Sequence, residues 1–174
     1  MNIFAVDNDP RQAAIDLSDK HVVKMILETA QILCTVAQQK GHQAPYRSTH
    51  KHHPVVKWTS MFADNWAWLV RHGFGLCWEY TERYKKIHTC QKIIQDMADR
   101  TTEIWPGFYY QDAAWEHHTP FVQCMPDIYK CDDPILAYRK YYVGEKSQFA
   151  KWKNTQPPKW YVEMLNEIQS KIKG

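Results

Sequence analysis

The strongest structural signal in the chain is the stretch Asp19-Lys20-His21-Val22-Val23-Lys24-Met25-Ile26-Leu27-Glu28. Helical periodicity brings His21, Lys24 and Glu28 to nearly the same face, about two turns from end to end. The rest of this helix surface is apolar and consists of Val22, Val23, Ile26, Leu27, Ala30, Leu33 and Cys34. Because a helix with so wide an apolar arc is largely buried, its ionisable stripe must face a partner, a cleft or a ligand.

The stripe of His21, Lys24 and Glu28 has two interpretations. In the first it lines a cleft, where Glu28 is partly desolvated and held by Lys24 and His21, a setting suited to acid/base or electrostatic catalysis. In the second it is a solvated stripe with one helical salt bridge, because Lys24 and Glu28 stand at i and i+4. The functional interpretation therefore depends on whether the stripe faces a cleft.

Length and composition indicate an ordinary globular protein with unusually many aromatic side chains. At 174 residues the chain can form a proper core and is most simply one domain over residues 1–174. Its eight Trp and ten Tyr provide flat surfaces that suit either a core or stacking on bases. The net charge of +3 is too small to establish a polyanionic partner. Residues 130–174 nevertheless hold nine Lys or Arg against five Asp or Glu, so the basic surplus lies in the C-terminal quarter.

Cysteine usage and hydropathy bear on the compartment. The five cysteines form no CxxC pair, and their odd number favours reduced thiols in a cytoplasm. No apolar run reaches membrane-spanning length, and no basic segment followed by an apolar core opens the chain. We therefore expect a soluble cytoplasmic protein without a membrane partner. No sequence signal bears on its oligomeric state.

Two histidine groups, His50/His52/His53 and His117/His118, resemble metal-binding sites only superficially. Neither has a Cys or a carboxylate at the spacing of a closed zinc site. A ferritin-like metal bundle is also disfavoured, because no Glu-x-x-His pair occurs on two helices. We expect neither a metal nor a cofactor.

The chain reads as a series of helices joined by loops. A capping residue followed by proline marks two helix starts, at Asp9-Pro10 and at Asp133-Pro134. No segment shows the apolar/polar alternation of a strand. The expected elements are an extended lead-in at 2–6, helices at about 10–17, 19–40, 54–73, 74–100, 134–151 and 158–174, a His-rich loop at 42–53 and an irregular connector at 101–133. The sequence thus predicts an all-α fold, a compact single-domain bundle of about five or six helices with a long irregular connector.

The His-rich loop is the first candidate surface for phosphate groups. Arg47, Lys51, His52 and His53 stand just before the helix that starts at Pro54, and a helix N-terminus attracts anions. The alternative is an ordinary solvated loop.

The C-terminal quarter is the second candidate surface for phosphate groups. Its aromatic residues fit a core face at helical spacing, and they are Tyr138, Tyr142, Phe149 and Trp152. The cations left for phosphates are Arg139, Lys140, Lys146, Lys151 and Lys153. The turn at Gln156-Pro157-Pro158 then presents Trp160 and Tyr161, which either probe a groove and stack on a base or anchor a helix start in the core.

Two motifs resemble those of the endonuclease V family of phage pyrimidine-dimer DNA glycosylases. Leu17-Ser18-Asp19-Lys20-His21 followed by Glu28 is similar to the family's Leu-x-Asp-x-His…Glu pattern, with the same seven-residue spacing from His to Glu. Gln156-x-Pro158-x-Trp160-Tyr161 is similar to its C-terminal Gln-x-Pro-x-Trp-Tyr segment. The resemblance covers the two ends of the chain well and the middle only in outline.

This resemblance implies a helical protein that clamps DNA. In the family an N-terminal α-amine attacks C1′ of the sugar and forms a Schiff base. The carboxylate that matches Glu28 stabilises the positive charge that builds on the sugar, and the C-terminal aromatic segment lies against a kinked duplex with an extruded nucleotide. In this sequence the available amine is that of Met1, because Asn2 is too bulky for routine removal of Met1. Leu27 and Gln31 replace the arginines that flank the family's Glu, so Lys24 is the nearest substitute for their charge.

Two functions from different classes follow. The first is a phage-type enzyme that acts on DNA, either a base-excision glycosylase or an enzyme that modifies an unusual base, with Glu28 as acid/base group or charge stabiliser. The second is a non-catalytic module that binds nucleic acid or nucleotides, such as a phage-encoded inhibitor, and uses the same stripe for recognition.

Overall fold

The computed structural model describes residues 1–109 and 114–173. Within these ranges every regular element is helical, which confirms the predicted all-α fold. The α-helices are α1 (Pro10–Asp16), α2 (Asp19–Gln39), α3 (Pro54–Met61), α4 (Ala63–Tyr84), α5 (Gln91–Asp99), α6 (Thr101–Ile104), α7 (Pro134–Tyr141) and α8 (Lys159–Lys173). Short 3-10 turns lie at Trp115–His117 and Asp127–Tyr129, and a π-helical turn, η4 (Tyr142–Lys146), continues α7. The organisation as one domain stays a prediction.

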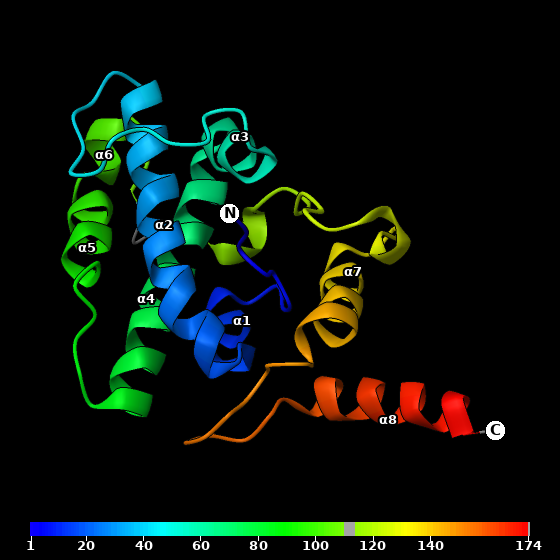
Figure 1. Ribbon diagram of the computed structural model, residues 1–174. Coiled ribbons are helices and arrows are strands. Elements are labelled where there is room, and N and C mark those ends of the chain that lie inside the picture. Colours follow the sequence, from blue (N-terminus) through cyan, green and yellow to red (C-terminus); the bar gives the residue numbers. More distant parts are fainter. Residues whose placement is uncertain (110–113, 174) are drawn as a thin grey trace.

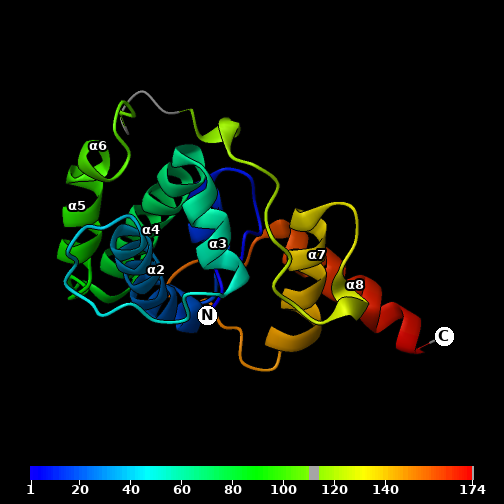
Figure 2. The same cartoon turned by 90° about the horizontal axis from the view of Figure 1, so that it is seen from above.

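Helix α4 is the central element of the bundle. It packs against α1, α2, α3 and α5, and Figure 1 shows α2 and α4 side by side between the α5–α6 pair and the α7–α8 pair. Seen from above in Figure 2, α7 and α8 again lie on the side opposite α5 and α6, and α8 extends outward. The buried core includes Trp66, Trp68 and Leu69 of α4 and Ile26 and Leu33 of α2.

The helix starts follow the predicted capping chemistry. The Asp9 carboxylate accepts the backbone N–H groups of Arg11 and Gln12 at the start of α1, and Asp133 does the same for α7. A proline fills the first helical position in both helices. The start of α2 differs, because the N-cap residue Ser18 makes no side-chain capping bond. Its polar atoms instead contact Tyr142, whose helix is distant in sequence.

The predicted helix boundary near Gly73 is wrong. Helix α4 continues through Gly73 and Gly75 to Tyr84, and the breaks lie instead at Phe62 and at 85–90. The glycines permit close packing, because a Cβ on Gly73 would lie 2.9 Å from Thr29 Cγ2 and one on Gly75 would lie 2.9 Å from Ala14 Cβ. Helix α4 ends where Lys85 adopts a left-handed conformation, with φ of 54°.

The other differences concern the helix count and the end of α7. The predicted helices at 54–73 and 74–100 correspond to three helices, α3, α4 and α5, and the predicted connector contains α6. The described residues therefore form eight α-helices, slightly more than the predicted five or six. The predicted helix at 134–151 is α-helical only to Tyr141 and then widens into η4. None of the described helices combines the length and apolar content that crossing a bilayer requires.

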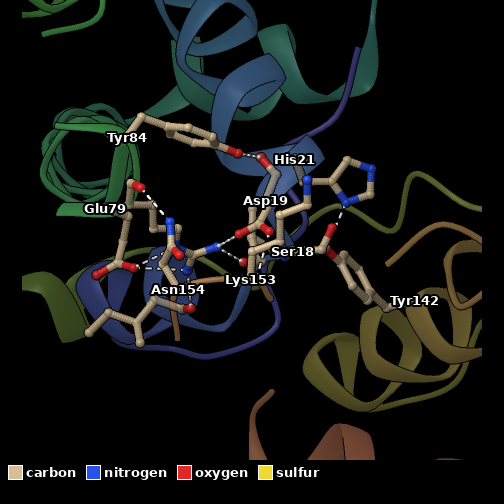
Figure 3. A network of polar contacts seen from close by, with 11 residues as sticks. Ser18, Asp19, His21, Glu79, Tyr84, Tyr142, Lys153 and Asn154 are labelled. Carbon is tan, nitrogen blue, oxygen red and sulfur yellow. Dashed lines mark hydrogen bonds and ion pairs between the residues drawn. The ribbon is translucent and has the colours of Figure 1, made fainter. Parts of the chain in front are cut away.

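A buried polar network ties the C-terminal segment to the start of α2 (Figure 3). Backbone hydrogen bonds and one carboxylate link Asp19 to the segment, since Asp19 N–H donates to Lys151 O at 2.9 Å and Lys153 N–H donates to Asp19 Oδ2 at 2.8 Å. Asn154 Nδ2 donates to the carbonyl of Arg83 at 2.6 Å. The segment 151–154 therefore has a fixed place beside the residues that follow Ser18 in α2.

Candidate active site

The four residues predicted to be catalytic, Met1, His21, Lys24 and Glu28, line one pocket of about 410 Å³. Helix α2 supplies the last three, and the chain start brings Met1 to them. The other lining residues are Asn2, Phe4, Lys20, Met25, Cys124, Tyr141, Lys146 and Phe149. The ionisable stripe of α2 thus faces a hollow with cations around it, as the functional interpretation of the sequence requires.

Glu28 lies between two cationic groups in this pocket. Its side chain is 11% exposed, and its Oε2 lies 3.9 Å from the Met1 amine. Lys24 Nζ lies 3.3 Å from Oε1, and the Lys24 side chain is 62% exposed. The Asn2 backbone N–H donates to Oε2 at 2.8 Å. Both carboxylate oxygens therefore have partners, and an amine stands close to the acid.

Asn2 organises the chain start, a role that the sequence analysis did not predict. Its Oδ1 accepts the backbone N–H groups of Ile3 at 2.7 Å and Phe4 at 3.1 Å, and its Nδ2 donates to Cys124 O at 2.9 Å. Phe4 has a φ of 46°, a left-handed conformation that costs a bulky residue about 1–3 kcal/mol. The sequence signal for this role is an Asn next to the chain start, since Asn side chains accept hydrogen bonds from nearby backbone N–H groups.

His21 is enclosed by aromatic rings. It stacks on Phe4 at a centroid distance of 4.3 Å and meets Tyr142 and Phe149 edge to face. Its Nδ1 lies 2.7 Å from the Tyr142 hydroxyl. Burial, together with the neighbouring lysines, lowers the pKa of His21 to about 3. His21 is therefore a neutral imidazole at neutral pH.

The loop residues predicted to bind DNA lie on the surface, at the start of α3. Arg47, Lys51 and His52 are exposed, whereas His53 is half-buried. His53 caps α3, because its Nδ1 accepts the Val55 backbone N–H at 3.2 Å. Burial lowers the pKa of His53, and the amine at the chain start contributes in the same direction, so this end of the loop lies near the pocket.

Three basic residues of the C-terminal quarter lie outside the lining of the pocket. Lys140, Lys151 and Lys153 are exposed, and the backbone of the last two is bonded to Asp19 at the start of α2. Lys20 and Lys146 line the pocket itself. Lys146 was among the cations predicted to contact phosphates, whereas Lys20 was not a predicted site residue. Lys20 Nζ lies 4.5 Å from the centroid of the Phe149 ring, and Lys146 Nζ lies 4.4 Å from that of Tyr141.

The side chains of Trp160 and Tyr161 pack against other residues of this chain. Trp160 Nε1 donates to Asp16 Oδ2 at 2.6 Å, and the Arg139 guanidinium lies 5.2 Å from its ring centroid. Tyr161 is only 6% exposed. These contacts favour the alternative of a helix start anchored in the core, and contact of the two rings with DNA stays a prediction.

No three His, Cys, Asp or Glu side chains of residues 1–109 and 114–173 come together in a group that could hold a metal ion.

Two buried histidines predict that acid weakens the fold. Burial lowers the pKa of His72 to about 4 and that of His21 to about 3, both below the value of 6.5 for an unperturbed histidine. The unfolded chain therefore binds protons that the folded chain does not, so the stabilisation is complete above pH 6.5 and is lost as the pH falls toward 4. Between pH 7 and pH 5 we expect the free energy of unfolding, measured by urea denaturation, to fall by roughly 2–4 kcal/mol.

The variant His72→Gln separates the two contributions, since it should show a shallower dependence on pH than the wild type. Stability that stays constant between pH 7 and pH 5 would show that neither histidine is held neutral by the fold.

Comparison with known proteins identifies the family of this chain. A family model described as pyrimidine dimer DNA glycosylase matches residues 1–92, more than half of the chain. The match contains Met1, His21, Lys24 and Glu28, whereas Cys124, Tyr141, Lys146 and Phe149 of the pocket lie beyond it. Searches of curated proteins and of solved structures find no match to the chain. With the helical fold, the motif residues in one pocket and a match of this extent, the chain belongs to the pyrimidine dimer DNA glycosylase family.

Proposed function

We propose that this protein cleaves the bond between a damaged pyrimidine base and its sugar in DNA, with the Met1 amine as nucleophile and Glu28 as the assisting carboxylate. The position of Glu28 relative to the Met1 amine is the main support for this proposal. Glu28, with a side chain only 11% exposed, holds Oε2 at 3.9 Å from the Met1 amine in a pocket lined by Lys20, Lys24 and Lys146. Membership of the glycosylase family makes DNA the substrate class.

The chemistry assigns separate roles to the amine and the carboxylate. The neutral amine attacks C1′, and the bond from C1′ to the base breaks with its electron pair leaving on the base, which takes up a proton. The nitrogen now bonded to C1′ then loses its two protons and forms a double bond to C1′. The C1′–O4′ bond breaks with its electron pair on O4′, which takes up one of these protons, while the other balances the proton taken up by the base. An imine between protein and sugar is left. Glu28 is placed to stabilise the positive charge on the sugar during bond breaking and to accept a proton from the amine.

The surrounding cations suit a polyanionic substrate. We propose that Arg47, Lys51, His52 and His53 contact phosphates on one side of the pocket. On the other side the proposed phosphate contacts are Lys140, Lys151 and Lys153. Lys24, which pairs with the carboxylate of Glu28, is the proposed contact for the nearest phosphate. This arrangement lets the DNA backbone pass across the mouth of the pocket.

A borohydride trap on damaged DNA tests this proposal. The protein is incubated with a duplex that contains one pyrimidine dimer, with sodium borohydride present, and an undamaged duplex of the same sequence is the control. We expect cleavage of the base–sugar bond at the dimer. We also expect a covalent protein–DNA adduct on the damaged duplex alone, because borohydride reduces an imine to a stable amine. Tight binding without an adduct and without cleavage of the base–sugar bond would refute the proposal and favour the non-catalytic DNA-binding module.

A further inference from the structure

The hydroxyl group of Tyr142 makes three polar contacts in the interior of the protein (Figure 3). Tyr142 begins the turn η4, and its side chain is fully buried. The Ser18 backbone N–H donates to Tyr142 Oη at 2.8 Å, and Tyr142 Oη donates to Ser18 Oγ at 2.9 Å. The third contact is with His21 Nδ1 at 2.7 Å. This cluster joins the start of α2 to the C-terminal part of the chain.

The number of protons in the cluster fixes the direction of the third contact. A phenolic hydroxyl has one proton, and that of Tyr142 is donated to Ser18 Oγ. The contact at 2.7 Å therefore requires the proton on His21 Nδ1, which donates to Tyr142 Oη. A neutral imidazole has only one N–H, so Nε2 of His21 carries a lone pair.

The groups around His21 disfavour a second proton on the ring, so the imidazole stays neutral and has a single N–H. Phe4, Phe149 and Tyr142 surround the ring, and the charged groups nearest to it are the ammonium groups of Lys20, Lys24 and Lys146. Burial and these cations all lower the pKa of the imidazole.

His21 lines the pocket, whereas Tyr142 and Ser18 do not. Since Tyr142 holds Nδ1, Nε2 is the ring nitrogen left for a partner in the pocket. We propose that Tyr142 and Ser18 are positioning residues, which hold His21 in the Nδ1–H tautomer so that Nε2 is a hydrogen-bond acceptor in the pocket. The catalytic consequence rests on the proposed function: Nε2 accepts a hydrogen bond from a donor group of the nucleotide bound in the pocket and so orients its sugar for attack by the Met1 amine.

Nitrogen NMR of the histidine rings tests the tautomer directly. In wild-type protein labelled with ¹⁵N-histidine, and with His21 assigned by a His21→Gln variant, we expect a pyrrole-type Nδ1 and a pyridine-type Nε2. In Ser18→Ala the Tyr142 proton has lost its acceptor and is free to turn to Nδ1. We therefore expect Nδ1 to become the pyridine-type nitrogen and Nε2 the pyrrole-type nitrogen. Tyr142→Phe should do the same, because the Nε2–H tautomer is the preferred one of an unconstrained histidine.

Tyr138→Phe is the matched control for these spectra. Tyr138 lies one turn earlier in α7, is equally buried, and donates its hydroxyl to Val122 O at 2.8 Å rather than to α2. We expect the wild-type tautomer of His21 in this variant. A pyrrole-type Nε2 in the wild type would show that the hydroxyl chain runs in the opposite direction and would overturn the proposal.

Kinetics then test the catalytic consequence. Ser18→Ala and Tyr142→Phe should both slow cleavage of dimer DNA by about tenfold or more with unchanged DNA affinity. Wild-type rates in both variants, with the tautomer exchanged, would overturn the role assigned to Nε2. If the wild-type protein does not act on dimer DNA but shows a pyridine-type Nε2, the proposed function fails and the tautomer assignment stands.

Discussion

Replacing Glu28 with Gln is expected to lower the rate of base–sugar bond cleavage in dimer DNA by roughly a thousandfold, with DNA affinity nearly unchanged. The amide cannot accept a proton from the Met1 amine and carries no charge to oppose the cation that develops on the sugar. It has the same shape and can still accept the Asn2 backbone N–H, which now bonds to Oε2 at 2.8 Å. The pocket should therefore keep its form. Single-turnover cleavage and a separate binding titration measure the two effects.

Glu103→Gln is the control for this change. Glu103 has a side chain 49% exposed, pairs with Arg100 and His42, and lies outside the pocket. We expect it to cleave at the wild-type rate. A Glu28→Gln variant that retained wild-type turnover would eliminate Glu28 from the mechanism.

Replacing Arg83 with Met should destabilise the protein by about 3–5 kcal/mol. The Arg83 side chain is 2% exposed and pairs with Asp19 at 3.2 Å and Glu79 at 2.8 Å. It also donates to the carbonyl oxygens of Leu17 at 2.8 Å and Ile15 at 2.9 Å. Removing it leaves two carboxylates without their cation and two buried carbonyls without a donor, and each such loss carries a desolvation penalty. Urea denaturation gives the change in the free energy of unfolding.

Arg100→Met provides the comparison on the surface. Arg100 also forms two ion pairs, with Asp96 and Glu103, but its side chain is 26% exposed and water replaces its partners readily. We expect a loss of about 1 kcal/mol or less. Equal losses in the two variants would contradict the view that the buried Arg83 side chain is an essential link between α4 and the start of α2.

The all-α fold and the family follow from features that are local in sequence. The spacing of His21, Lys24 and Glu28 needs only helical periodicity, and the capping of α1 and α7 needs only Asp9-Pro10 and Asp133-Pro134. A glycine inside an apolar helix carries no such unambiguous information. Gly73 suits a helix end and close packing equally well, and the neighbour that decides between them, Thr29, belongs to another helix.

The pocket could be predicted only in part, because half of its wall comes from distant segments. Tyr141, Lys146 and Phe149 reach α2 through the fold of the C-terminal quarter, and no periodicity relates them to His21. Tyr142 illustrates the limit, since its spacing correctly predicts a core position. The contact of its hydroxyl with His21 depends on how α7 meets α2, which spacing does not encode.

The apolar arc of α2 is also narrower than expected. Val23 is 38% exposed and Leu27 is 39% exposed, although both were assigned to the apolar surface of a largely buried helix. The helix faces solvent at these positions. This explains why Lys24, between them in sequence, reaches water while Glu28 lies in the pocket.

Peptide mapping of the borohydride-reduced adduct identifies the attacking nitrogen. Two amines stand near Glu28 in the pocket, the Met1 α-amine at 3.9 Å and Lys24 Nζ at 3.3 Å, so the identity of the nucleophile is open to direct measurement. The account predicts that the sugar is attached to the α-amine of the N-terminal peptide. Attachment to Lys24 or to another lysine would contradict it.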